Sequence, residues 1–121
     1  MSILTWVEVV LLGGTGAVAR FLVDRTVGAR LGRAFPFGTL TVNVTGAAIL
    51  GLLSGLALNP DAALVASTAA VGSYTTFSTW MLETHRAAEE RQWPIAAANI
   101  VVSVVLGLAA ALAGQAIGAH W

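Results

Sequence analysis

Four long apolar runs dominate this chain of 121 residues and leave little room for any other kind of fold. The charged residues, only 10% of the sequence, separate apolar runs at about 4–23, 37–58, 62–84 and 94–118. A helix needs about 20 apolar residues to cross the hydrocarbon core of a bilayer, so each run is long enough to span it. The pattern predicts one all-α membrane domain over residues 1–121, with four transmembrane helices.

Composition narrows the class of protein further. The chain is 57% hydrophobic, which is more apolar than the roughly half apolar average of soluble domains. Its formal net charge of zero argues against nucleic-acid binding. Pro36, Pro60 and Pro94 all fall where an apolar run begins, and proline is tolerated in a first helical turn but not in a helix interior. The prolines therefore support the boundaries of the runs.

The six arginines indicate an orientation. Arg20 lies near the end of the first run, and the others lie in the connections between runs one and two and between runs three and four. Both termini and the connection around residues 59–61 contain no Lys or Arg. The positive-inside rule places the arginine-bearing connections in the cytoplasm and both termini outside. We therefore expect a multi-pass protein of the plasma membrane.

The third run contains an unusual polar stretch between Gly72 and Trp80. Its hydroxyl residues are Ser73, Tyr74, Thr75, Thr76, Ser78 and Thr79. Irregular backbone at membrane depth is tolerated where it is buried in protein or lines a polar cavity, and a broken helix exposes carbonyls that bind small cations. We predict a helix break near Gly72. The alternative is a continuous, slightly bent helix whose hydroxyls bond to carbonyls one turn earlier.

Polar side chains also recur at helical spacing in runs two and four. Thr39 and Asn43 are four residues apart, and Asn99, Ser103 and Gly107 follow at the same step. Residues four apart share a helix face, so the donors of these two sets could line one path, with Gly107 leaving a gap for close approach. The alternative for an amide inside a membrane is a structural hydrogen bond to a neighbouring helix.

Two aromatic residues could help to bind an anion that has lost its water. Phe77 and Trp80 share a helix face, and aromatic rings have positive edges. Ring edges and hydroxyl donors would bind a small anion weakly enough for it to leave, as conduction requires. Packing in the protein core is the alternative use of such a pair.

Two ionisable residues lie near membrane depth. Arg20 and Glu83 are close to the ends of their runs, and charged groups within a membrane are functional candidates by default. The alternative is that both side chains reach out to the interface.

Glycine pairs predict close helix packing. Gly51 and Gly55 in the second run, and Gly114 and Gly118 in the fourth, have the four-residue spacing that lets helix backbones approach each other in lipid. The alternative is that glycine is simply common in membrane helices. The sequence contains no arrangement typical of an enzyme: its two histidines, His85 and His120, stand in a connection and at the terminus.

Three stretches together resemble a known family, the Fluc (CrcB-type) fluoride channels of microbial membranes. They are residues 13–20 (GGTGAVAR), 36–43 (PFGTLTVN) and 72–79 (GSYTTFST). The resemblance implies a passive channel that exports fluoride and protects against its toxicity. It also implies an antiparallel dual-topology dimer with two fluoride pathways and a broken third helix.

The resemblance further implies roles for single residues. Backbone carbonyls of Gly72 and Thr75 would hold a structural Na⁺ that is not transported. Asn43, Phe77, Ser103 and Glu83 match pathway positions of the family. The wider set of expected pathway residues adds Thr39, Thr76, Thr79 and Trp80, with Arg20 in a structural role.

The sequence departs from the family pattern in two respects. Trp80 stands where a second phenylalanine is usual, and Asn99 and Gly107 stand where Tyr and Ser are frequent. A chain that inserts both ways should show little charge bias, whereas all arginines here favour one orientation. This bias favours a heterodimer with a paralogous chain of opposite orientation, and a homodimer is the alternative.

Two other functions are compatible with a small four-helix chain. A proton-coupled multidrug exporter would need a carboxylate deep in the first span, but Glu8 lies close to the end of that span. A non-conducting assembly subunit would use the same glycine packing but would not need the hydroxyl stretch.

Overall fold

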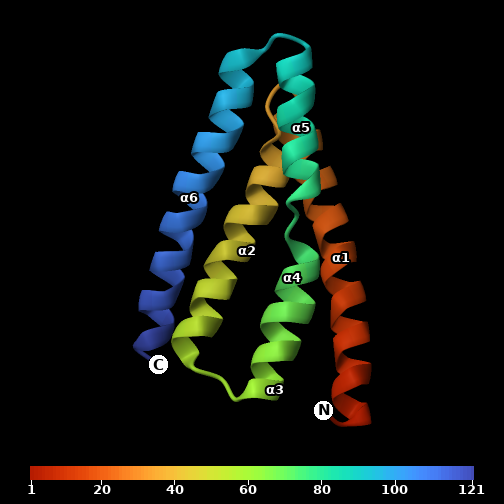
Figure 1. The fold of residues 1–121 in the computed structure, drawn as a ribbon, viewed down its shortest axis with the longest axis vertical. Helices are drawn as coiled ribbons and strands as arrows, with labels where there is room; N and C mark the ends of the chain where they lie inside the picture. The colour runs from red at the N-terminus through yellow and green to blue at the C-terminus, as the bar shows by residue number, and fades with distance from the viewer.

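The protein is entirely helical in a computed structural model that describes residues 1–121. Its three longest helices are α1 (Ile3–Leu31), α2 (Phe37–Leu56) and α6 (Trp93–Ala119), and each is long and apolar enough to cross a membrane. Between α2 and α6 the chain forms α3 (Pro60–Ala63), the π-helix η1 (Leu64–Val71), α4 (Gly72–Tyr74) and α5 (Ser78–Glu89). These shorter elements follow one another along the bundle (Figure 1).

Local sequence signals explain where several helices begin. Ser2 caps α1 by accepting a hydrogen bond from the Thr5 amide, and Asn59 caps α3 in the same way. Pro60 and Pro94 lie in the first turns of α3 and α6, and Pro36 directly precedes α2. The prediction that the prolines mark helix starts is confirmed.

Helix α1 is longer than the apolar run that predicted it. It continues from residue 23 to Leu31, so Asp24, Arg25 and Arg30 stand on the helix and not in a connection. Charged residues can remain helical once they lie beyond the hydrocarbon core, where the interface solvates them. The helix ends at Gly32, whose φ of 83° is accessible to glycine and rarely to other residues.

Helices α2 and α6 pack against each other through their glycines. A methyl group added at Gly51 would collide with the carbonyl oxygen of Ala111, and one added at Gly114 would collide with that of Ala48. Gly55 and Gly118 make equivalent approaches one turn further along the helices. Both pairs therefore serve the close packing that their spacing predicts.

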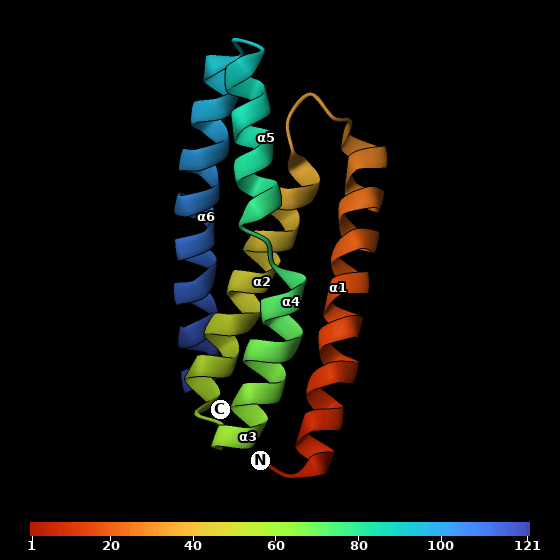
Figure 2. The same cartoon turned by 45° about the vertical axis from the view of Figure 1, so that its right-hand side comes forward.

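The segment between α4 and α5 is not helical. Thr75 has an extended backbone, with φ −79° and ψ 164°, and helix resumes at Ser78. Figure 2 shows this segment as a thin connection halfway along the bundle. We predicted a break near Gly72; Gly72 itself has helical torsions, and the interruption begins at Thr75, three residues further on. The non-helical residues are therefore 75–77, and Gly72 is not among them.

Both chain termini lie at one end of the bundle. The connections from α1 to α2 and from α5 to α6 lie at the opposite end (Figures 1 and 2). Arg33, Arg86 and Arg91 stand in or beside these two connections, with Arg25 and Arg30 on the last turns of α1. Positive charge is therefore concentrated at the end away from the termini.

Candidate ion pathway

Asn43 of α2 holds the non-helical segment in place. Its Nδ2 donates to the carbonyl of Thr76 at 2.8 Å, and its Oδ1 accepts from the Thr76 amide at 2.9 Å. A peptide that leaves a helix loses both ladder partners, and a carboxamide can replace the donor and the acceptor together. Asn43 thus makes a structural hydrogen bond to a neighbouring segment, which was the predicted alternative to a role in the pathway.

The hydroxyls of the polar stretch are used in two ways. Those of Ser73 and Thr75 bond back to the carbonyls of Ala70 and Val71, at 3.0 and 3.2 Å, as in the continuous-helix alternative. The Thr76 hydroxyl instead accepts from the Thr79 amide at 3.2 Å and so caps the start of α5. The hydroxyls of this stretch therefore bond to the last turn before the interruption and cap the helix that follows it.

Two backbone carbonyls lose their usual partners as a result. In a continuous helix the amide of Thr76 would donate to Gly72, and the amide of Thr79 would donate to Thr75. Here these amides donate to the side chains of Asn43 and Thr76. The carbonyls of Gly72 and Thr75 are consequently available to another ligand.

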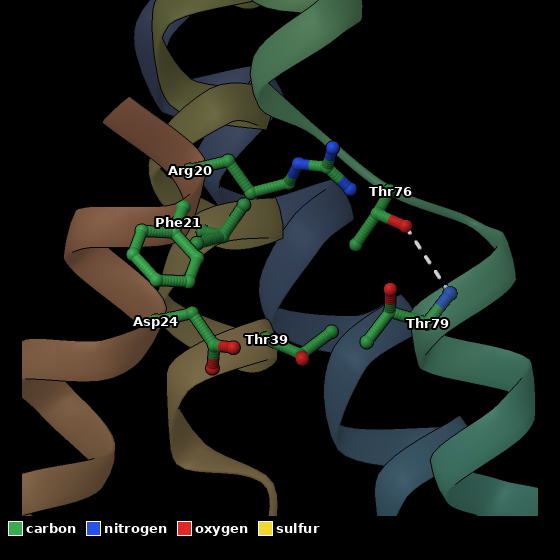
Figure 3. Close-up of a pocket in the computed structure, with 7 residues that line it drawn as sticks. Arg20, Phe21, Asp24, Thr39, Thr76 and Thr79 are labelled. Carbon is green, nitrogen blue, oxygen red and sulfur yellow. Dashed lines mark hydrogen bonds between the residues drawn. The ribbon is translucent and has the colours of Figure 1, made fainter. Parts of the chain in front are cut away.

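A cavity of about 240 Å³ lies between α1, α2, α5 and the interruption, and Figure 3 shows the residues that line it. Arg20 reaches across it toward Thr76, and Asp24 and Thr39 lie below (Figure 3). The complete lining is Arg20, Phe21, Asp24, Thr39, Val42, Thr76 and Thr79. The Arg20 guanidinium forms no ion pair within 4.0 Å, so this cavity contains a cation without a direct counterion, together with the neutral hydroxyls of Thr39, Thr76 and Thr79.

A second polar cavity, of about 310 Å³, lies at the end that bears the arginines. Its lining includes Arg33, Arg86, Glu83 and Glu90. One carboxylate oxygen of Glu83 is buried without a hydrogen-bond partner, and this side chain approaches Thr39 of the first cavity. The pair Thr39 and Glu83 therefore lies between the two cavities.

A third cavity, of about 240 Å³, also adjoins the interruption. Asn43, Gly72 and Thr75 line it together with Ser67 and small residues of α2. The structure thus brings most of the predicted site residues to one level of the bundle, around the interruption. Their predicted roles in sodium and fluoride binding stay predictions.

The two aromatic residues differ in their surroundings. Phe77 is 69% exposed as a residue, and its ring contacts that of Trp80 edge to face, with ring centroids 5.9 Å apart. Trp80 is held between helices: its Nε1 donates to the backbone carbonyl of Asn99 in α6 at 2.9 Å. Core packing therefore does not account for Phe77, whose ring stands on the surface of the single chain.

Ser103 is placed apart from the residues at the interruption. It lies one turn after Asn99 on α6, and it does not line the three cavities described above. Its hydroxyl is nevertheless buried and has no hydrogen-bond partner.

Sequence reasoning missed three contributors. Asp24 lines the first cavity because α1 continues past the apolar run, and its four-residue spacing from Arg20 could have indicated a shared helix face. Phe21 joins it there. The Thr84 hydroxyl accepts a hydrogen bond from the side-chain Nδ2 of Asn99 at 2.8 Å, and no sequence signal predicted that contact between α5 and α6.

Comparison with known proteins identifies the family. Residues 7–115 match the family model described as "CrcB-like protein, Camphor Resistance (CrcB)". The fluoride-specific ion channel FluC 2 of Mycobacterium bovis is 67% identical over 95% of this chain and 91% of its own length. FluC 2 of Mycolicibacterium paratuberculosis is 63% identical, over 94% and 93% of the two chains. FluC 1 of Symbiobacterium thermophilum is 42% identical, over 95% and 98%. The chain belongs to the CrcB family.

Proposed function

We propose that this protein is a passive, fluoride-selective channel that exports cytoplasmic fluoride across the plasma membrane. Relatives at 67% and 42% identity carry the name fluoride-specific ion channel. The observation that carries the proposal is the polar cavity lined by Arg20, Thr39 and Thr76, beside the segment that Asn43 holds, in a bundle otherwise built for lipid.

Fluoride suits a pore without energy coupling. Hydrofluoric acid enters a cell uncharged and dissociates at neutral pH, which traps the anion inside. A negative membrane potential then drives the anion outward with about 2.3 kcal/mol per charge per 100 mV. A channel therefore needs only a selective path, with donors that bind fluoride weakly.

The proposed pathway follows the polar residues described above. Thr39, Thr76, Thr79 and Arg20 would form a first polar region, Glu83 would stand beside it, and Asn43 would shape the narrow part by holding the interruption. Phe77 and Trp80 would offer ring edges, and Ser103 a hydroxyl from α6. The exposure of the Phe77 ring supports a pathway completed by a second subunit.

The fold that we propose in the membrane has four spans. Elements α3, η1, α4 and α5 together would make the third span, broken at Thr75–Phe77. Two such chains would associate in opposite orientations, so that their broken spans cross at the centre of a dimer with two pathways.

A structural sodium ion fits the carbonyls of Gly72 and Thr75. Oxygen ligands suit a hard cation, and the two amides that would otherwise occupy these carbonyls donate elsewhere. Bound there, the ion would supply positive charge at the centre of an anion channel. This chain's own residues would contribute only backbone oxygens to it.

Fluoride efflux tests the proposed function. Purified protein in sodium-containing liposomes should release fluoride, measured with an electrode, and should retain chloride measured in parallel. Efflux of both ions alike would contradict selectivity. Silence from folded protein, alone and with a paralogous chain, would overturn the channel assignment.

The charge bias supports a heterodimer with a paralogue inserted the other way. The five arginines at residues 25, 30, 33, 86 and 91 lie toward the end of the bundle away from both termini. The positive-inside rule then favours a single orientation, with the termini outside. Tags on either terminus should therefore be labelled by impermeant reagents from outside intact cells. Equal labelling from both sides would contradict a fixed orientation and favour the homodimer.

A further inference from the structure

Tyr74 and Thr45 form a hydrogen bond that joins α4 to α2 directly before the interruption. Their hydroxyl oxygens are 2.8 Å apart. We propose that this bond makes Tyr74 a positioning residue for the structural sodium ion, because it fixes the backbone between the carbonyls of Gly72 and Thr75. The proposal rests on the sodium site, and so on the proposed function.

Tyr74 is the donor of this pair, and Thr45 is the acceptor. The Thr45 oxygen also lies 2.7 Å from the Thr41 carbonyl and 3.1 Å from the Val42 carbonyl. A carbonyl can only accept, so Thr45 directs its single hydroxyl hydrogen at these two oxygens. The hydrogen between the two side chains therefore comes from the Tyr74 hydroxyl. Removing that hydroxyl removes the bond and leaves the other contacts of Thr45 intact.

The Tyr74 bond complements the one that Asn43 makes after Thr75. The carbonyl of Thr75 and the amide of Thr76 belong to one planar, trans peptide group. Because that amide donates to Asn43 Oδ1 at 2.9 Å, the Thr75 carbonyl points away from the Asn43 oxygen. Tyr74 holds the residue immediately before Thr75. Helix α2 therefore fixes the chain on both sides of one of the two carbonyls.

The contact between α2 and α4 is close at Gly46. A methyl group added there would collide with the Thr75 side chain and would lie 3.4 Å from the Tyr74 ring. Gly46 lines the third cavity together with Gly72 and Thr75, so both carbonyl-bearing residues adjoin one space. Because α4 is only the three residues Gly72–Tyr74, a displacement of Tyr74 also displaces Gly72. The spacing of the two carbonyls thus depends on where Tyr74 is held.

A cation binds more tightly to ligands that are already held in place, because binding then costs less ordering of the protein. Without the Tyr74 hydroxyl, α4 is held to this part of α2 by packing alone, and sodium binding would have to order it. The loss should match the strength of one hydrogen bond between membrane helices, which corresponds to about threefold in a binding constant.

Sodium-dependent thermal unfolding tests this role without measuring transport. The assembly that conducts, purified in detergent, should unfold at a higher temperature as Na⁺ replaces N-methylglucamine at constant ionic strength. Tyr74→Phe removes only the hydroxyl and should raise the Na⁺ concentration for half-maximal stabilisation about threefold. Thr45→Val should raise it equally, and the double variant should raise it no further. Independent effects would multiply to about ninefold and would overturn the proposal.

Two control variants separate positioning from a general loss of stability. Thr45→Ser keeps the acceptor and should retain the Na⁺ requirement of the wild type. Thr41→Val removes a hydroxyl one turn earlier on α2, which bonds back to the Phe37 carbonyl, and should also leave the requirement unchanged. A Tyr74→Phe variant with the Na⁺ requirement of the wild type would overturn the proposal, even if it unfolded at a lower temperature in both salts.

Measurements on the wild type distinguish this inference from the function on which it rests. If Na⁺ gave no stabilisation while the same preparation still released fluoride selectively, the sodium site and the role of Tyr74 would be overturned and the channel would stand. If fluoride efflux were also absent, the proposed function would be overturned with them.

Discussion

Asn43→Ala should lower fluoride efflux by at least about a hundredfold while leaving the protein folded in detergent. The substitution removes both hydrogen bonds to Thr76 and leaves a donor and an acceptor of that peptide unpaired. Each unpaired buried group costs about 1–3 kcal/mol, and about 1.4 kcal/mol corresponds to a factor of ten. We expect the non-helical segment to move, because no other side chain bonds to the Thr76 backbone. Electrode recordings from liposomes would measure the loss.

The matched control for Asn43→Ala is Gln115→Ala, which deletes an exposed carboxamide of α6. It should leave efflux within about twofold of the wild type, as surface substitutions usually change little. Asn43→Asp is also informative, because it keeps an acceptor for the Thr76 amide but adds a negative charge beside the path. Normal efflux from folded Asn43→Ala would show that the pathway does not depend on this clamp.

Gly114→Val should prevent α2 and α6 from packing and should abolish the folded protein. Even one methyl group at Gly114 would collide with the carbonyl of Ala48, and the neighbouring Leu52 amide lies 2.9 Å from the same point. Backbone atoms cannot turn aside as side chains can, so the helices must separate along their contact. Overpacking typically costs about 1–3 kcal/mol, and a contact between two backbones lies at the upper end or beyond. Size-exclusion chromatography after graded heating would report the loss.

Gly107→Val provides the comparison on the same helix. A Cβ atom at Gly107 meets nothing within 4 Å, so this variant should elute as the wild type does after heating. If Gly114→Val remained as stable as Gly107→Val, the glycine contact between α2 and α6 would not hold the bundle together.

Sequence patterns predicted those features that depend on local chemistry or helical spacing. The prolines marked helix starts, and Gly51 and Gly114 indicated a close contact because a four-residue step places small residues on one face. The hydroxyl stretch indicated irregular backbone in the third run. Each of these signals is contained within about one or two helical turns.

Features that depend on distant partners were less predictable. The helix is interrupted from Thr75 and not at Gly72, because the Asn43 side chain donates to the Thr76 carbonyl and accepts from the Thr76 amide. Asn43 lies 33 residues before Thr76 in the chain. The hydrogen bonds between Trp80 and Asn99 join residues 19 apart on different helices. Propensity and spacing contain no information about such pairs, so the sequence could suggest the residues but not their partners.

The position of the two termini at one end of the bundle restricts how two copies could be joined in a single polypeptide (Figure 1). A short linker from the C-terminus of one copy to the N-terminus of the next would insert both copies in the same direction. To reverse the second copy, the linker must itself cross the bilayer, which requires about 20 apolar residues. A tandem gene duplication would therefore give an oppositely oriented pair only after it acquired an additional membrane-spanning segment.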